Sequence, residues 1–131
     1  MADKQFRIEK DSLGEVKVPK KVLWGAQTQR AVNNFPVSGI SMNFPFTNSF
    51  VTAIGVIKDA AAKANKNLGL LESTKQRAIS KAAKEVWQNK HNDQFPVDVF
   101  QTGSGTSTNM NANEVIANLA TKYAGEKIDP N

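Results

Sequence analysis

Apolar residues between positions 50 and 68 repeat with the spacing of one face of a helix. The positions, separated by four and three residues in alternation, are Phe50, Ile54, Ile57, Ala61, Ala64 and Leu68. This pattern predicts a helix that packs the stripe against the rest of the protein. Val51 and Ala53 widen the stripe, so we expect burial on more than one side. Gly69 follows, where a helix commonly ends in a left-handed residue.

A second helix is predicted to begin at Ser73. Gln76, three residues later, completes the pattern of a capping box, in which side chains satisfy backbone N–H groups at the helix start. The inner face of this helix is expected to consist of Ala78, Ile79, Ala82, Ala83, Val86 and Trp87. After it, residues 95–100 alternate in apolarity and predict a short extended segment.

The last predicted helix, from about residue 108 to residue 123, is apolar nearly all round, which indicates burial. It also carries Glu114 and four asparagines, and such groups are costly to bury unless they are hydrogen-bonded. This helix therefore fits best inside a larger assembly. We expect the surface formed by residues 110–120 to self-associate when it is left uncovered.

Residues 1–46 are predicted to be mostly irregular. A turn at 13–15 precedes a short edge strand at 16–19, and a short helix at 26–34 ends before Pro36. The helix ends there because the residue before a proline disfavours the α conformation. The expected fold class is therefore mainly α, with short strands near the N-terminus, in one domain of 131 residues.

The composition excludes several kinds of functional site and several cellular locations. The chain has no cysteine and a single histidine, His91, which excludes thiolate and His-rich metal sites. No metal and no cofactor are expected. No apolar run is long enough to span a membrane, and the N-terminus lacks the order of a signal peptide. A cytoplasmic protein is expected, or a mitochondrial-matrix protein in a eukaryote.

The net charge of +5 favours an anionic partner. The basic residues are scattered and no nucleic-acid motif is present, so neither a nucleic acid nor a membrane is expected as a partner. A small carboxylate remains compatible with the charge.

Candidate chemistry lies in the stretch before the last helix. Gly103 and Gly105 separate three hydroxyl residues, Thr102, Ser104 and Thr106. Glycine lets the backbone approach a ligand closely, and the N–H groups of the following helix favour an anion. The stretch lacks the Gly-Lys-Ser/Thr ending of a P-loop. It is a carboxylate cradle or, alternatively, a flexible linker with a Ser/Thr cap.

Three longer motifs carry a resemblance. They read FPVDVFQTGSGTSTNMNANEVIAN at 95–118, LWGAQTQR at 23–30 and RIEKDSLG at 7–14. All three closely resemble the corresponding segments of class II fumarases, which are lyases of the fumarase/aspartase superfamily. The resemblance implies that residues 1–131 are an N-terminal domain of the lyase type. In this family a central helical bundle and a C-terminal domain follow, and the chains form homotetramers whose active sites combine three subunits.

The resemblance also implies an activity, the reversible hydration of fumarate to L-malate in the tricarboxylic acid cycle. Ser104, Gly105 and Thr106 match the family's substrate-carboxylate loop. The asparagines behind the loop, which would orient it, are Asn109, Asn111 and Asn113. The family's base, a serine assisted by a histidine, lies beyond residue 131. No catalytic residue is therefore expected in this chain, which should be inactive alone.

A secondary dicarboxylate site of the family corresponds to Asp129, Pro130 and Asn131. Asp129 replaces the usual histidine, and its carboxylate would repel a dicarboxylate, which argues against that site in this protein. Two other functions stay open: an aspartate ammonia-lyase and a non-catalytic binding or assembly module. Aspartate ammonia-lyases usually carry Gly-Gly-Ala-Gly-Thr where this chain has Ser104 at the third position, so Ser104 favours a fumarase.

The remaining conspicuous side chains are interpreted as structural. His91 is expected at the solvated surface, and the two tryptophans, Trp24 and Trp87, in packing. Asp98 and Glu114 are expected to be hydrogen-bonded structural carboxylates.

Overall fold

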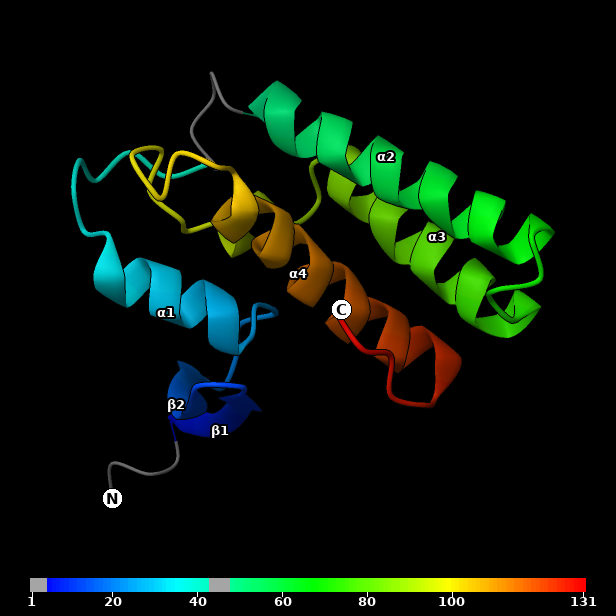
Figure 1. Ribbon diagram of the computed structural model, residues 1–131, viewed down its shortest axis with the longest axis horizontal. Coiled ribbons are helices and arrows are strands. Elements are labelled where there is room, and N and C mark those ends of the chain that lie inside the picture. Colours follow the sequence, from blue (N-terminus) through cyan, green and yellow to red (C-terminus); the bar gives the residue numbers. More distant parts are fainter. Residues whose placement is uncertain (1–4, 43–47) are drawn as a thin grey trace.

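The fold is built mainly from helices, as predicted. The computed structural model describes residues 5–42 and 48–131, and Figure 1 shows α2, α3 and α4 side by side with α1 and the β-hairpin at one end. In chain order the elements are β1 (Phe6–Asp11), β2 (Gly14–Pro19), α1 (Ala26–Asn34), α2 (Asn48–Asn67), α3 (Ser73–Trp87), a 3₁₀ turn (Asn92–Gln94) and α4 (Thr106–Ala124).

The N-terminal hairpin is more regular than the sequence indicated. β1 and β2 pair antiparallel, with Phe6 opposite Pro19 and Asp11 opposite Gly14. Gly14 has φ +105°, a conformation that favours glycine and allows the tight reversal. The predicted strand at 16–19 is confirmed as part of β2, whereas β1 was not predicted. Burial alternates along β1, but its large apolar side chains, Phe6 and Ile8, lie on the exposed side, so the strand has no apolar core face.

Arg7 ties this hairpin to the segment that leads into α1. Its Nη1 donates to the carbonyl oxygens of Pro19 (2.9 Å) and Val22 (2.8 Å). Its Nη2 donates to the carbonyl of Trp24 at 2.6 Å, and its Nε donates to Glu9 Oε1 at 2.8 Å. One guanidinium therefore satisfies several carbonyls in a stretch that has no regular structure of its own.

Glu114 of α4 supplies the N-terminal cap of α1, which begins at Ala26 as predicted. The Gly25 N-cap has no side chain, and the first N–H groups of a helix need partners from elsewhere. The Glu114 carboxylate accepts from the backbone N–H of Gly25 (2.8 Å), Gln27 (2.8 Å) and Thr28 (3.1 Å). It also accepts from the Thr28 hydroxyl. The prediction of a structural, hydrogen-bonded Glu114 is confirmed.

The buried face of α2 differs from the predicted one. Val51, Gly55 and Ala62 are buried against α3, because the two helices approach closely. A Cβ on Gly55 would lie 2.9 Å from the backbone nitrogen of Trp87, so only glycine fits without a shift of the helices. The predicted stripe is wrong as a core face, because most of its residues are exposed. The helix ends before Gly69, which has φ +75°, as predicted.

The inner face of α3 is confirmed, but its predicted cap is wrong. Ala78, Ala82, Ala83 and Val86 are buried in the core. The N-cap position is Glu72, which makes no side-chain capping bond, and the Gln76 amide donates instead to the Ser80 hydroxyl at 2.7 Å. The side chain of Gln76 thus points along the helix rather than back to its start.

The last helix, α4, is buried within this chain. Its buried residues include Asn111 and Glu114 together with apolar side chains on most of its circumference. The expectation that residues 110–120 form an uncovered surface is wrong, because α1, α2 and α3 already cover them. Gly125 ends the helix in a left-handed conformation, as predicted. In the described part of the chain, no helix combines the length and apolarity needed to cross a membrane.

Candidate functional site

The hydroxyl-rich loop lies at the exposed N-terminal end of α4. Gly103 and Gly105 both have positive φ, +79° and +78°, so each requires glycine to turn the chain. The hydroxyls of Thr102, Ser104 and Thr106 form a row, with Oγ–Oγ distances of 3.1 Å and 3.0 Å. The row faces solvent at the positive end of a 19-residue helix. This arrangement presents several donors to an anion.

Gln101 holds the loop against the helix, a role that the sequence reading missed. Its Oε1 accepts from the Thr108 backbone N–H at 3.1 Å, and its Nε2 donates to the Thr108 hydroxyl. The side chain therefore bridges the first turn of α4 and closes the loop between residues 101 and 108. Glutamine is not a usual capping residue, so its type gave no signal for this role.

Asp98 fixes the segment that precedes the loop. Its carboxylate accepts from the Ser38 N–H (2.8 Å) and hydroxyl (2.9 Å), the Gly39 N–H (3.0 Å) and the Phe100 N–H (2.8 Å). Burial, the largest single influence, raises the pKa of Asp98, but the hydrogen bonds from Phe100, Ser38 and Gly39 together outweigh it and lower the pKa to about 2. The prediction of a structural carboxylate is confirmed.

The hydrogen bonds of Asp98 should therefore stabilise the protein less at acid pH. A pKa lowered from 3.8 to about 2 on folding contributes stability that is fully present above pH 3.8. This stability is lost as the pH falls towards 2. In urea denaturation, the Asp98→Asn variant should be less stable than the parent chain at pH 6, and the difference should shrink at pH 2.5. A difference that stays constant with pH would contradict this role.

Asn109, one of the three asparagines expected behind the loop, is held by a lysine of α2. Lys58 Nζ donates to Asn109 Oδ1 at 2.7 Å, and the Asn109 N–H donates to the Gly105 carbonyl at 3.0 Å. Desolvation by burial lowers the pKa of Lys58. Asn109 is thus held by its backbone at the loop glycine and by its side chain at a half-buried ammonium.

The other two asparagines have different surroundings. Asn111 is fully buried and donates to the Gln94 carbonyl at 2.8 Å, which fastens the 3₁₀ turn to α4. Asn113 lies a helical turn beyond Asn109 and faces a cavity, with Met110 Sδ as a weak acceptor at 3.6 Å. The structure thus brings Asn109 close to the loop and places Asn111 on another side of the helix.

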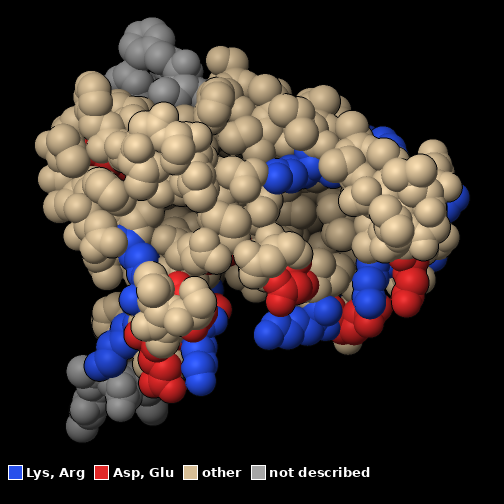
Figure 2. All heavy atoms as spheres, viewed as in Figure 1, with Lys and Arg blue, Asp and Glu red and all other residues tan. Residues whose placement is uncertain are grey.

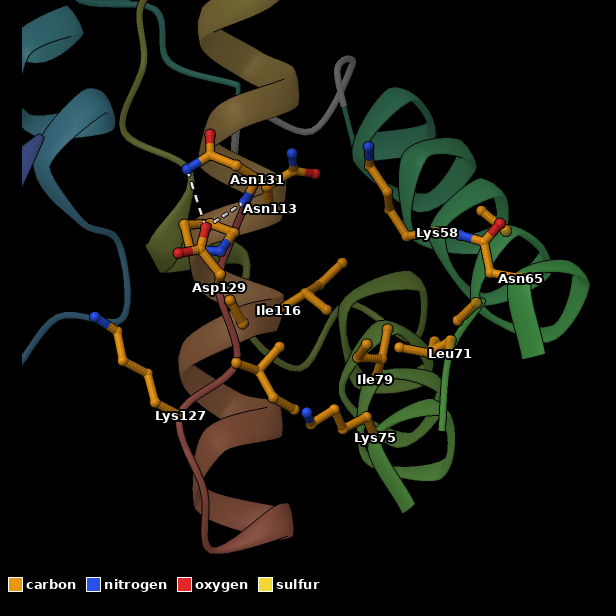
Figure 3. Close-up of a pocket in the computed structure, with 15 residues that line it drawn as sticks. Lys58, Asn65, Leu71, Lys75, Ile79, Asn113, Ile116, Lys127, Asp129 and Asn131 are labelled. Atoms are coloured by element: carbon orange, nitrogen blue, oxygen red, sulfur yellow. Dashed lines mark hydrogen bonds between the residues drawn. The ribbon is translucent and has the colours of Figure 1, made fainter. Parts of the chain in front are cut away.

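The cavity that Asn113 faces has a volume of about 470 Å³ and lies between α2, α3, α4 and the C-terminal segment (Figure 3). Lys58, Lys75 and Lys127 line it together with apolar side chains such as Ile116. Asp129 and Asn131 also line it, and Asp129 accepts from the Asn131 N–H (2.8 Å) and amide (3.0 Å). These hydrogen bonds lower the pKa of Asp129, so it is a carboxylate at neutral pH.

Charge on the visible face follows the expectation from the sequence. Figure 2 shows basic and acidic side chains interspersed along one edge rather than gathered into a basic patch.

His91, expected at the solvated surface, is only partly exposed and is paired with a glutamate. Its Nε2 lies 2.8 Å from Glu85 Oε2, and the side chain is 23% exposed. Tyr123 donates to the other oxygen of Glu85 at 2.6 Å. Desolvation and this bond raise the pKa of Tyr123 to about 12. The group joins α3 to the end of α4 and has a structural role.

Comparison with known proteins places this architecture in a class. The family model described as lyase matches residues 14–131, so the chain belongs to the lyase family.

Among curated relatives, the class II fumarate hydratase of Halobacterium salinarum is 60% identical over 94% of this chain. That of Corynebacterium glutamicum is 53% identical over the whole chain. The recombinant class II fumarase of Schistosoma mansoni has a similar structure, with a TM-score of 0.88 and 39% identity over 96% of this chain. The chain spans 25–27% of the length of these three relatives.

Proposed function

We propose that the 131 residues form the N-terminal part of a fumarate hydratase, which interconverts fumarate and L-malate in the tricarboxylic acid cycle. The observation that carries the proposal is the identity of 53–60% to class II fumarate hydratases over 94–100% of the chain. The hydroxyl row at the start of α4 supports it, because its donors suit the carboxylate of a small dicarboxylate.

In this proposal the loop binds and stabilises but does not move a proton. The hydroxyls of Ser104 and Thr106 and the backbone at Gly105 hold one substrate carboxylate. Proton removal beside that carboxylate gives it additional negative charge, and donors already in place stabilise this charge without reorganisation. The base lies outside residues 1–131, in the parts that the longer relatives possess.

Asn109 is the asparagine best placed to orient the loop. Its amide is fixed by Lys58 at 2.7 Å, and its backbone N–H is bonded to Gly105. Asn113 faces the cavity, so it could orient the loop only through whatever occupies that cavity. Asn111 bonds the Gln94 carbonyl and thereby supports α4 itself. We assign no secondary dicarboxylate site to Asp129, Pro130 and Asn131, because the Asp129 carboxylate lies in the cavity wall.

The proposal extends to assembly and location. A full-length protein of this kind would be a cytoplasmic homotetramer that needs no cofactor and shares each active site among subunits. Residues 1–131 would be its N-terminal lyase-type domain, followed by a helical bundle and a C-terminal domain.

The test compares the full-length protein with residues 1–131 alone. We expect the full-length protein to interconvert fumarate and malate, followed by fumarate absorbance, and to release no ammonia from aspartate. The 131-residue chain should show no turnover, because the proposal places the base outside residues 1–131.

Other outcomes are equally informative. Ammonia release from aspartate would identify an aspartate ammonia-lyase instead, and no turnover of either substrate by the full-length protein would leave a binding or assembly module. Turnover by the short chain that disappears in Ser104→Ala would show that a complete site exists within 131 residues.

A further inference from the structure

Gln101 caps α4 from outside the helix. The N-cap residue, Gly105, has no side chain, so the first N–H groups of the helix need an acceptor from another residue. The Gln101 carboxamide supplies one, because its Oε1 accepts from the Thr108 N–H at 3.1 Å while its Nε2 donates to the Thr108 hydroxyl. A longer bond, 3.4 Å, joins the same Nε2 to the Asp98 carbonyl. Two bonds to one residue fix the plane of the carboxamide as well as its position.

The loop that carries the hydroxyl row is anchored at both ends. Thr108 is 1% exposed, so the far end of the loop is fixed in the core. The near end is held by Asp98, whose carboxylate accepts from the Phe100 N–H at 2.8 Å. Between these anchors, a Cβ added at Gly103 or Gly105 would meet no atom within 4 Å. The loop therefore has little packing of its own, and its shape depends on the anchors.

The group that caps α4 is neutral, although a charged group would stabilise the helix more. The N-terminus of a helix carries a partial positive charge, so a carboxylate is the more favourable partner there. In the same fold, α1 is capped by the carboxylate of Glu114. A glutamate in place of Gln101 would retain the acceptor for the Thr108 N–H but would add a negative charge beside the loop. That charge would repel a bound substrate carboxylate.

The first turn of α4 keeps its positive character in other ways as well. It contains no acidic residue. The cap takes up the N–H of Thr108, the third residue of the helix, whereas the N–H of Thr106 makes only a long contact, 3.5 Å, with the Ser104 hydroxyl. The cap therefore holds the loop and leaves the end of the helix that adjoins the hydroxyl row to a ligand.

We propose that Gln101 is a positioning residue for the hydration of fumarate, which caps α4 without placing a negative charge beside the substrate carboxylate. This inference rests on the proposed function, because the neutrality of the cap matters only if the loop holds an anion. Two requirements meet at this position. The side chain must fix Thr108, so that the hydroxyl row is in place before the substrate arrives, and it must be uncharged. Glutamine meets both requirements, whereas glutamate meets only the first and methionine only the second.

Two substitutions in the full-length protein separate these requirements. Gln101→Glu keeps an acceptor for the Thr108 N–H, and the Thr108 hydroxyl can donate to its other oxygen. Gln101→Met has a similar length but loses both bonds. We expect the backbone amides of residues 101–110 to exchange hydrogen at the parent rate in Gln101→Glu and about ten-fold faster or more in Gln101→Met. Mass spectrometry of the corresponding peptide measures this local opening.

Steady-state kinetics gives the readout that a merely structural cap would not change. We expect kcat/KM for fumarate to fall about ten-fold in both variants, for different reasons. The loss in Gln101→Glu comes from repulsion, so it should shrink as the ionic strength rises, whereas the loss in Gln101→Met should not depend on salt. If Gln101 were only a structural cap, Gln101→Glu would retain the parent kcat/KM.

A matched control makes the same substitution in the first turn of another helix. The Gln76 amide donates to the Ser80 hydroxyl in α3 at 2.7 Å, and Gln76→Glu should retain the parent kcat/KM at every ionic strength. With an active parent, the role of Gln101 is refuted by parental kcat/KM in either of its variants, by parental exchange in Gln101→Met or by fast exchange in Gln101→Glu. A loss in Gln101→Glu that salt does not reduce, or an equal loss in Gln76→Glu, also refutes it. A full-length parent that does not hydrate fumarate refutes the proposed function itself.

Discussion

Replacing Thr106 with valine in the full-length protein is expected to lower kcat/KM for fumarate hydration by about ten- to a hundred-fold. Valine keeps the shape of the side chain but removes the hydroxyl at the end of the row, 3.0 Å from the Ser104 hydroxyl. A hydrogen bond to a charged group contributes about 1.5–3 kcal/mol, which corresponds to this change in rate. Steady-state kinetics in both directions would measure the effect.

A matched substitution separates the loop from a general effect of losing a hydroxyl. Thr74 lies exposed at the start of α3, and Thr74→Val should leave kcat/KM unchanged. The proposed role of Thr106 fails if Thr106→Val folds normally and retains the parent rate.

Replacing Glu114 with alanine should destabilise the 131-residue chain by about 3–5 kcal/mol, because buried donors lose their acceptor. The carboxylate accepts from three backbone N–H groups and one hydroxyl, and Glu114 is only 4% exposed. Without it, the first turn of α1 has no cap, and the hydrogen bonds from the α1 start to α4 are lost. Urea denaturation followed by circular dichroism measures the free energy of unfolding.

Two further variants make this result decisive. Glu114→Gln retains one acceptor oxygen and should cost less than the alanine variant, which also covers the case in which Glu114→Ala does not fold. Glu72→Ala, at an exposed glutamate, should change stability by no more than about 0.5 kcal/mol. Equal stabilities of the Glu114 variants and Glu72→Ala would show that the cap is unimportant.

Local signals in the sequence located the helices well. Pro36 after α1 and Gly125 after α4 are breakers whose effect depends only on the neighbouring backbone, and both helices end where these residues predicted. The loop at 102–106 was recognised for the same reason, because its glycines and hydroxyls lie close together in the chain.

The orientation of α2 could not be read from its own residues. Two sides of this helix are apolar, and the side with the larger residues was the natural choice for the core. The structure buries the other side because Gly55 lets α3 approach closely, and that fit depends on Trp87. Periodicity reports how wide an apolar face is, but it does not report which part of that face finds a partner in the same chain.

The other features that the sequence did not predict depend on contacts between residues far apart in the chain. Glu114 reaches donors 86 to 89 residues earlier in the chain, and nothing near either end of that contact marks the pairing. The antiparallel partner of β2 was missed in a similar way, since β1 exposes Phe6 and Ile8.

The contacts of Arg7 set a limit on how far the N-terminus can be shortened or fused. A tag attached ahead of residue 5 leaves these contacts in place, whereas a deletion that removes Arg7 releases the carbonyls of Pro19, Val22 and Trp24 together. Trp24 directly precedes Gly25, whose N–H is one of the groups bound by the α4 carboxylate. Trimming the hairpin would therefore loosen the start of α1, although the deleted residues themselves lie outside the helical layer (Figure 1).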